Sequence, residues 1–158
     1  MQFIELSRTN GIEILGISDP LFPSRYREIP DAPVVIHVKG NVHALNVEKT
    51  LAIVGTREPT EFGIKAGERL SSIFAKHQFV VVSGLAVGCD AVAHLGCLNA
   101  GGITVAIMAC GLDNIYPSEN RQWLTEFWIL TDAGFPSILS ECHLEIIRLS
   151  TEIGYKAG

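Results

Sequence analysis

Apolar residues gather into short runs in the middle of the chain, and glycine-containing turns follow these runs. Residues 51–54 form the first run, residues 79–82 the second and residues 103–110 the third. Each run is apolar at nearly every position instead of alternating with polar residues. Such runs are typical of strands that are buried on both faces of a parallel sheet.

Longer segments with a helical pattern separate these runs. The first begins after Pro59-Thr60 and places apolar residues roughly on one face, namely Ile64, Leu70, Ile73 and Phe74. The second is expected to be capped by Asp90 and to stop at Gly101-Gly102. A third is expected from Ser118 and includes Trp123 and Phe127, and residues 137–139 are a fourth candidate strand.

The first 46 residues differ in pattern from the rest. Four prolines punctuate them, and residues 34–38 form their single expected strand. This segment is too rich in proline for a helix to be expected. We therefore interpret residues 1–46 as an N-terminal arm of the same folding unit. Residues 47–158 are predicted to be a Rossmann-like α/β domain with three layers and a mainly parallel sheet.

Composition supports one ordered domain. The chain has 158 residues, of which 47% are hydrophobic and 18% are charged. Its formal net charge of -5 does not suggest a nucleic-acid-binding protein, so any contact with DNA has to come from a local patch. No signal peptide or membrane segment is evident, and the four cysteines form no CxxC pair. We expect a cytoplasmic protein that has no membrane contact.

Glycine and small polar residues follow each of the three predicted strands. The three loops begin with Gly55-Thr56-Arg57, with Ser83-Gly84 and with Gly111. Because parallel strands end at one edge of a sheet, these loops should converge there. Glycines allow a ligand close to the backbone, and N–H groups at the helix starts favour anions, so a phosphate-binding pocket is predicted. Arg57 is a candidate clamp on a phosphate oxygen.

Standard nucleotide motifs are absent from the sequence. No GxxxxGK[ST] run occurs, which excludes a P-loop NTPase, and no GxGxxG run follows a strand. Tyr116 lies in a loop and is a candidate for stacking on bases, whereas Trp123 is more typical of a core.

Two other kinds of chemistry, a zinc site and a hydrolase triad, each lack a feature that they require. Cys89, His94 and Cys97 lie on one short predicted helix and lack an evident fourth zinc ligand. A hydrolase triad of Ser83, His94 and Asp90 lacks a GxSxG turn after a strand. We therefore expect no metal, no cofactor and no catalytic residue.

Several stretches resemble the DNA-processing protein A family (DprA, also called Smf). The stretches are Tyr-Arg-Glu-Ile-Pro-Asp-Ala-Pro at 26–33, Val-Lys-Gly-Asn at 38–41, Ala-Ile-Val-Gly-Thr-Arg at 52–57, residues 82–94, residues 111–121 and Leu-Ser-Glu at 139–141. The resemblance covers roughly residues 17 to 141.

The resemblance implies a recombination mediator that binds single-stranded DNA and loads the RecA recombinase during natural transformation, without catalysis. It also implies a homodimer. By position, it assigns the phosphate pocket to Gly55, Thr56, Arg57, Ser83, Gly84, Gly88, Asp90, Tyr116, Asn120 and Glu141, which we consider together with Gly111 from the third loop.

The sequence departs from the family pattern in two places. Val87 stands where family members usually have an arginine, which removes a cation from the rim of the pocket. The basic segment that follows the Ser-Glu pair in the family is also missing, so the chain is expected to be shortened at its C-terminus.

Two other functions use the same residues. A sensor of a nucleotide-derived small molecule tolerates the missing arginine better than a DNA-binding protein does. A phosphoribohydrolase of the LOG type would use Asp113, Glu119 and Glu141, but the Pro-Gly-Gly-x-Gly-Thr motif of those enzymes is absent.

Overall fold

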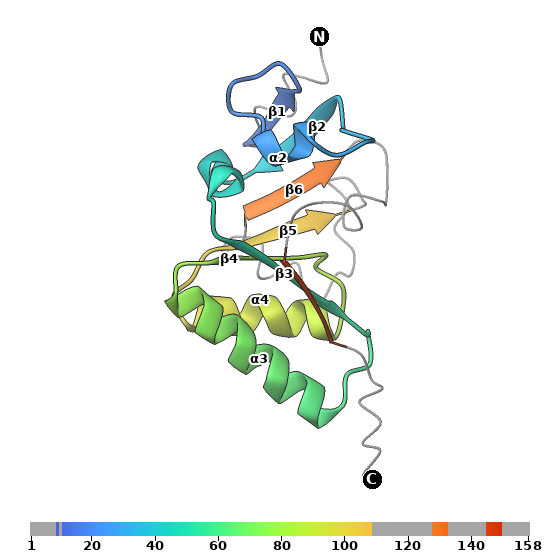
Figure 1. Ribbon diagram of the computed structural model, residues 1–158, viewed down its shortest axis with the longest axis vertical. Coiled ribbons are helices and arrows are strands. Elements are labelled where there is room, and N and C mark those ends of the chain that lie inside the picture. Colours follow the sequence, from blue (N-terminus) through green and yellow to red (C-terminus); the bar gives the residue numbers. More distant parts are fainter. Residues whose placement is uncertain (1–8, 10, 109–127, 133–144, 150–158) are drawn as a thin grey trace.

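The computed structural model of the protein describes residues 9, 11–108, 128–132 and 145–149. These residues form a seven-stranded sheet in the order β1-β2-β6-β5-β4-β3-β7 (Figure 1). The strands are β1 (Ile12–Gly16), β2 (Val35–Lys39), β3 (Thr50–Gly55), β4 (Val80–Ser83), β5 (Thr104–Met108), β6 (Trp128–Asp132) and β7 (Glu145–Leu149).

The three apolar runs become β3, β4 and β5, and they are neighbouring parallel strands, as predicted. Strand β6 extends the parallel part beside β5, and β7 extends it beside β3. The prediction of a Rossmann-like, mainly parallel sheet is therefore confirmed. The sequence analysis did not predict β6 or β7, while the third helix from Ser118 and the strand at 137–139 lie outside the described residues.

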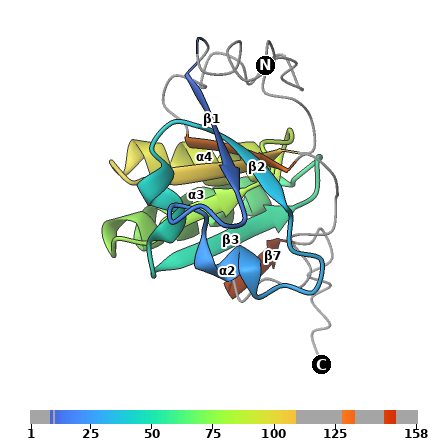
Figure 2. The same cartoon turned by 90° about the horizontal axis from the view of Figure 1, so that it is seen from above.

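Helices α3 (Glu61–Lys76) and α4 (Cys89–Asn99) lie side by side on one face of the sheet (Figures 1 and 2). The Thr60 side chain caps α3 by accepting a hydrogen bond from the Gly63 N–H at 3.2 Å. Helix α4 stops just before Gly101, which adopts a φ of 73°. The prediction that Asp90 caps this helix was wrong, because Gly88 is the N-cap and Asp90 lies in the first turn.

The predicted apolar face of α3 was only partly right, because Phe74 packs against the core and Ile64 and Leu70 are half-buried, but none of the four predicted residues is fully buried. Its buried residues are the small ones, Gly67, Ser71 and Ala75, whereas Ile73 is 42% exposed. The reason is that α3 packs closely on α4. A Cβ atom added to Gly96 would lie 2.8 Å from the Glu68 carbonyl oxygen and would also collide with the Ser71 hydroxyl. Small residues on both helices let the two backbones approach.

Side chains on both faces of the central strands are buried, as expected for three layers. Leu51, Ile53 and Val81 pack with α3 and α4 in one cluster. The alternate positions, such as Ala52 and Val82, pack in a second cluster with residues of the N-terminal arm. The alternation follows from the two-residue period of a strand.

The N-terminal arm carries more structure than the sequence analysis expected. It contains two strands instead of one, and both a short helix α2 (Ser24–Arg27) and a 3-10 helix η1 (Val42–Asn46) form despite the prolines. Pro23 directly precedes α2, so the prolines flank these short helices without interrupting them. The Arg25 guanidinium fixes the arm by donating to the carbonyl oxygens of Val47 and Glu48 and to the Thr50 hydroxyl. The domain boundary at residue 46 stays a prediction.

His94 is a core residue of α4. Its Nδ1 lies 2.7 Å from the Thr104 hydroxyl oxygen, and the Thr104 hydroxyl donates to the Val81 carbonyl oxygen at 2.8 Å. Because the hydroxyl proton is used in that second bond, Nδ1 has to donate to Thr104. Complete burial lowers the pKa of His94 to about 3, so the ring is neutral near pH 7.

None of the helices in the described ranges has both the length and the apolar character that crossing a membrane requires.

The close contact of α3 with α4 can be tested with a matched pair of substitutions. Gly96→Ala should lower the free energy of unfolding by about 1–3 kcal/mol, because the added methyl group meets backbone atoms of α3. The control is Gly63→Ala in the same helix pair, where the nearest atom is at an ordinary 3.4 Å. That variant should be neutral or up to about 1 kcal/mol more stable. Urea denaturation measures both, and equal effects would contradict the packing described above.

Burial of His94 predicts a pH dependence of stability. The pKa of His94 is about 3 in the folded protein against an ordinary 6.5, so the unfolded chain binds the proton more readily as the pH falls. The contribution of the neutral, buried His94 to the free energy of unfolding is therefore fully present above the ordinary pKa of histidine and decreases as the pH falls below it. We expect a loss of about 2 kcal/mol between about pH 7 and pH 5. Denaturant titrations of His94→Gln should lack this slope, and those of the exposed His43→Gln should keep it.

Candidate phosphate pocket

Strands β3 and β4 deliver two of the three predicted loops to the same edge of the sheet. Strand β3 ends at Gly55 and the parallel strand β4 ends at Ser83. The Cys89 N–H at the start of α4 donates to the Thr56 carbonyl oxygen at 3.0 Å. This bond joins the end of the second loop to the beginning of the first.

Gly88 makes the contact between the loops possible. Its φ is 84°, and a Cβ atom there would lie 2.5 Å from the Thr56 carbonyl oxygen and 2.6 Å from the Arg57 carbonyl carbon. Any other residue would therefore push the two loops apart and strain the backbone. Leu85 also has a positive φ, 62°, and its side chain is fully buried.

Asp90 lies beneath the second loop and is buried. Its carboxylate accepts a long hydrogen bond from the Ala86 N–H at 3.4 Å, and Oδ2 lies 2.9 Å from where a Gly84 Cβ would be. Burial raises the pKa of Asp90, and hydrogen bonds from backbone N–H groups, that of Ala86 first, lower it in part. We interpret Asp90 as a residue that holds the loops in position from below.

Ser83 has a similar supporting geometry. Its side chain is fully buried, and its hydroxyl donates to the Ile53 carbonyl oxygen at 2.6 Å. The bond connects β4 to β3 directly below the loops. The Ser83 hydroxyl therefore contributes to the pocket by fixing the strand ends.

The groups that face solvent lie in the first loop and at the rim of the second. Gly55 and Arg57 are exposed, Thr56 is half-buried, and its hydroxyl accepts from the Glu58 N–H at 3.2 Å. Within the ranges that the structure describes, Arg57 forms no ion pair. Val87 is 41% exposed at the rim. Arg57 is thus available to an anion.

The position of the first loop in the sheet favours a ligand site. From β3 the chain continues to β4 and β5 on one side, whereas β7 lies on the other side. The carboxyl end of β3 is therefore a point where the strand order reverses, which is where open α/β sheets bind ligands. In addition, no side chain among the described residues caps the N-terminus of α4, whereas Thr60 caps α3. The Thr56 carbonyl oxygen accepts a hydrogen bond from the first of the N–H groups at this helix start, that of Cys89, and the N–H groups that remain attract anions.

The remaining predicted pocket residues are not part of this geometry. Gly111, Tyr116, Asn120 and Glu141 lie outside the described residues, and so do the carboxylates of the phosphoribohydrolase interpretation, Asp113 and Glu119 among them. The structure thus brings together Gly55, Thr56, Arg57, Ser83, Gly84, Gly88 and Asp90.

The side chains considered for zinc or for a hydrolase triad are engaged in the core. His94 Nδ1 bonds to Thr104, the Cys97 thiol donates to the Ile103 carbonyl oxygen at 3.2 Å, and the Ser83 hydroxyl donates to Ile53. Burial raises the pKa of Cys97 to about 11 and also raises that of Cys89. In the described ranges, no group of three histidine, cysteine or acidic side chains is placed to hold a metal ion.

Sequence reasoning missed two contributors to this geometry. The backbone N–H of Ala86 donates to the Asp90 carboxylate, and because any residue except proline has such an N–H, the residue type does not reveal this role. Leu85 anchors its loop in the core, and its apolar side chain among small loop residues is a signal that could have indicated this role.

Comparison with known proteins adds independent information. The sequence pattern of the DNA recombination-mediator protein A family matches residues 13–146. Protein Smf from Synechocystis is 39% identical over 124 residues, which are 77% of this chain and 31% of that protein. The DNA processing protein DprA from Bacillus subtilis is 36% identical over 73% of this chain and 39% of its own length. The chain thus spans less than two fifths of the length of these relatives.

Solved structures agree with the sequence matches. DprA from Streptococcus pneumoniae superposes with a TM-score of 0.71 at 33% identity, covering 83% of this chain and 47% of that one. The DprA of Helicobacter pylori, whose structure was described for its binding of single-stranded DNA, gives a TM-score of 0.68 at 28% identity. That match covers 79% of this chain and 57% of the other. The chain therefore belongs to the DNA recombination-mediator protein A family.

Proposed function

We propose that this chain binds single-stranded DNA through the phosphate backbone, at the loops that follow β3 and β4. The observation that carries the proposal is the docking of Gly88 on Thr56 and Arg57, which brings the uncapped start of α4 beside an exposed arginine. Backbone N–H groups and a guanidinium are the usual partners of phosphate oxygens. The single-stranded DNA bound by the Helicobacter pylori relative supports the choice of ligand.

The proposed role is that of a recombination mediator without catalysis. The family description supports a role in DNA recombination. On the basis of the resemblance alone, we also propose that bound DNA is passed to the RecA recombinase in the cytoplasm during natural transformation. The resemblance also supports a homodimer. We assign the outer part of the pocket, by the same resemblance, to Gly111, Tyr116, Asn120 and Glu141.

A second candidate is a sensor of a nucleotide-derived small molecule. It is favoured by Val87, which presents an apolar side chain at the rim where the family usually has arginine. The net charge of -5 also weakens the attraction of a long polyanion. The two candidates differ in how affinity depends on ligand length.

The role of Arg57 is tested by Arg57→Ala. Removal of its charge should weaken the binding of a fluorescent oligothymidylate by about 1–3 kcal/mol, because a charge-assisted contact with phosphate is lost. The slope of log affinity against log salt should become shallower by about 0.7, the value for one contact on a single strand. The control Lys39→Ala removes an exposed charge on β2, distant from β3 in the sheet, and should change neither quantity. Unchanged affinity and slope in Arg57→Ala would contradict a phosphate contact.

Ligand length separates DNA binding from the sensor. A strand-binding surface gains contacts as the strand lengthens, so affinity should increase from a mononucleotide to an oligonucleotide of about twenty bases at constant salt. The increase should be shallow because the chain is acidic and lacks the rim arginine. Fluorescence anisotropy measures the series. Equal affinity for the mononucleotide and the long oligonucleotide would favour the sensor and exclude DNA as the ligand.

A further inference from the structure

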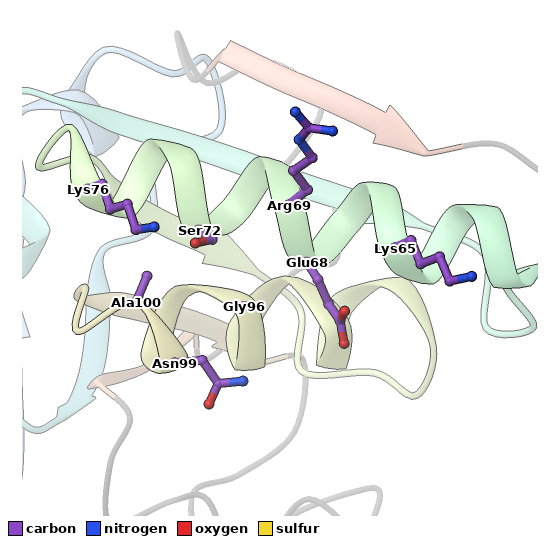
Figure 3. A pocket seen from close by; sticks show the side chains of 8 residues that line it. All are labelled: Lys65, Glu68, Arg69, Ser72, Lys76, Gly96, Asn99 and Ala100. Carbon is purple, nitrogen blue, oxygen red and sulfur yellow. The ribbon is translucent and has the colours of Figure 1, made fainter.

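A groove lies between the outer surfaces of α3 and α4, away from the glycine loops. It has a volume of ≈ 450 Å³, and its lining includes Lys65, Arg69 and Lys76 from α3 and Gly96 and Asn99 from α4 (Figure 3). The groove is open to solvent along its length. It is not part of the candidate pocket described above.

The three cations of the groove follow one line along the exposed side of α3. They are separated by four and then seven residues, spacings that return to nearly the same face of an α-helix. All three are exposed, and none forms an ion pair within the described part of the chain. In a protein with a net charge of -5, such a line is a local row of positive charge, and Glu61 and Glu68 are the acidic residues of the same helix.

The neighbouring groups are compatible with an extended anionic ligand. Glu68 is an acidic residue of the lining, and its side chain projects toward α4 while Arg69 projects the other way (Figure 3). Ser72 and Asn99 supply neutral hydrogen-bonding groups. Phe62, at the first turn of the same face, is 68% exposed and offers an aromatic ring for stacking.

We propose that this face of α3, defined by Phe62, Lys65, Arg69 and Lys76, is a second contact surface for single-stranded DNA. The inference rests on the proposed DNA binding and extends it beyond the glycine loops. Helix α3 begins at Glu61, four residues after Arg57, so its first turn starts near the pocket edge. A strand that leaves Arg57 along α3 would pass Phe62 first and Lys65 next.

The length of the face sets the length of the strand that it can hold. Lys65 and Lys76 are eleven residues apart, which is about 16 Å along a helix. Phosphates spaced at about 3.4 Å along a stacked strand would place roughly five nucleotides over this distance. DNA longer than the pocket itself should therefore gain affinity from α3.

An acidic protein is a different occupant that the same charges could attract. The structure favours nucleic acid because the cations follow a regular line, an exposed aromatic residue lies at one end, and the groove is open to solvent. Peptide recognition in a groove usually depends on apolar anchors in pockets.

The test compares short and long oligothymidylates, of about two and about twenty nucleotides, on the full chain and on charge variants. In Lys65→Ala, Arg69→Ala and Lys76→Ala, affinity for the long strand should fall about fivefold per cation at 0.1 M salt, and affinity for the short strand should stay unchanged. Arg57→Ala should weaken both ligands. Lys39→Ala is the matched control and should weaken neither.

Thermal unfolding by circular dichroism verifies that these exposed variants keep the fold. Unchanged affinity for the long strand in all three α3 variants would overturn the second surface and leave the pocket intact. Absence of binding of either strand to the unaltered chain would overturn the proposed function together with this extension. Competition by polyglutamate as strong as that by oligothymidylate of equal charge would replace DNA with an acidic protein as the occupant of α3.

Discussion

The backbone contact of Gly88 with Thr56 and Arg57 is the constraint on which the candidate site depends. It forces the loop after β4 against the loop after β3, and the Cys89 N–H then bonds to the Thr56 carbonyl oxygen. Ser83 and Asp90 support the two loops from inside the protein, so the start of α4 and the first loop with its exposed Arg57 are held in place. A ligand that binds these groups meets a surface that is already arranged.

The same preference for close backbone approach recurs between the helices. Gly96 and Ser71 let α3 lie directly on α4, and the longer side chains of α3 are left on its outer side. Close packing of the inner face is therefore what exposes Phe62 and the cations that line the groove. Structural stability and the surface chemistry of α3 arise from one arrangement of small residues.

Much of the central fold could be predicted from the sequence. The apolar runs form β3, β4 and β5, because a short run that is apolar at nearly every position is typical of a strand buried on both faces of a parallel sheet. The buried face of α3 could not be predicted, because apolar periodicity identifies contacts with a sheet and gives no signal for a helix that packs through glycine and serine. Asp90 had the residue type of an N-cap, but Gly88, with its positive φ, takes the N-cap position two residues before Asp90. The exposed position of Arg57 agrees with the predicted phosphate contact. The inward direction of the Ser83 hydroxyl could not be predicted, because it depends on a hydrogen bond to Ile53, which is thirty residues away in the sequence.

The place of β6 in the sheet has a consequence for the order of folding during synthesis. Strands β3 to β5 and their helices follow one another along the chain and can associate as soon as residue 108 has left the ribosome. The arm is made first, yet β2 reaches the parallel strands only through β6, which is made later and inserts between β2 and β5. The hydrogen-bonding edge of β2 has to wait for a partner more than eighty residues downstream. The N-terminal arm is thus made first but joined to the sheet late. Interruption of synthesis before β6 would leave the facing edges of β2 and β5 unpaired, and unpaired strand edges favour aggregation.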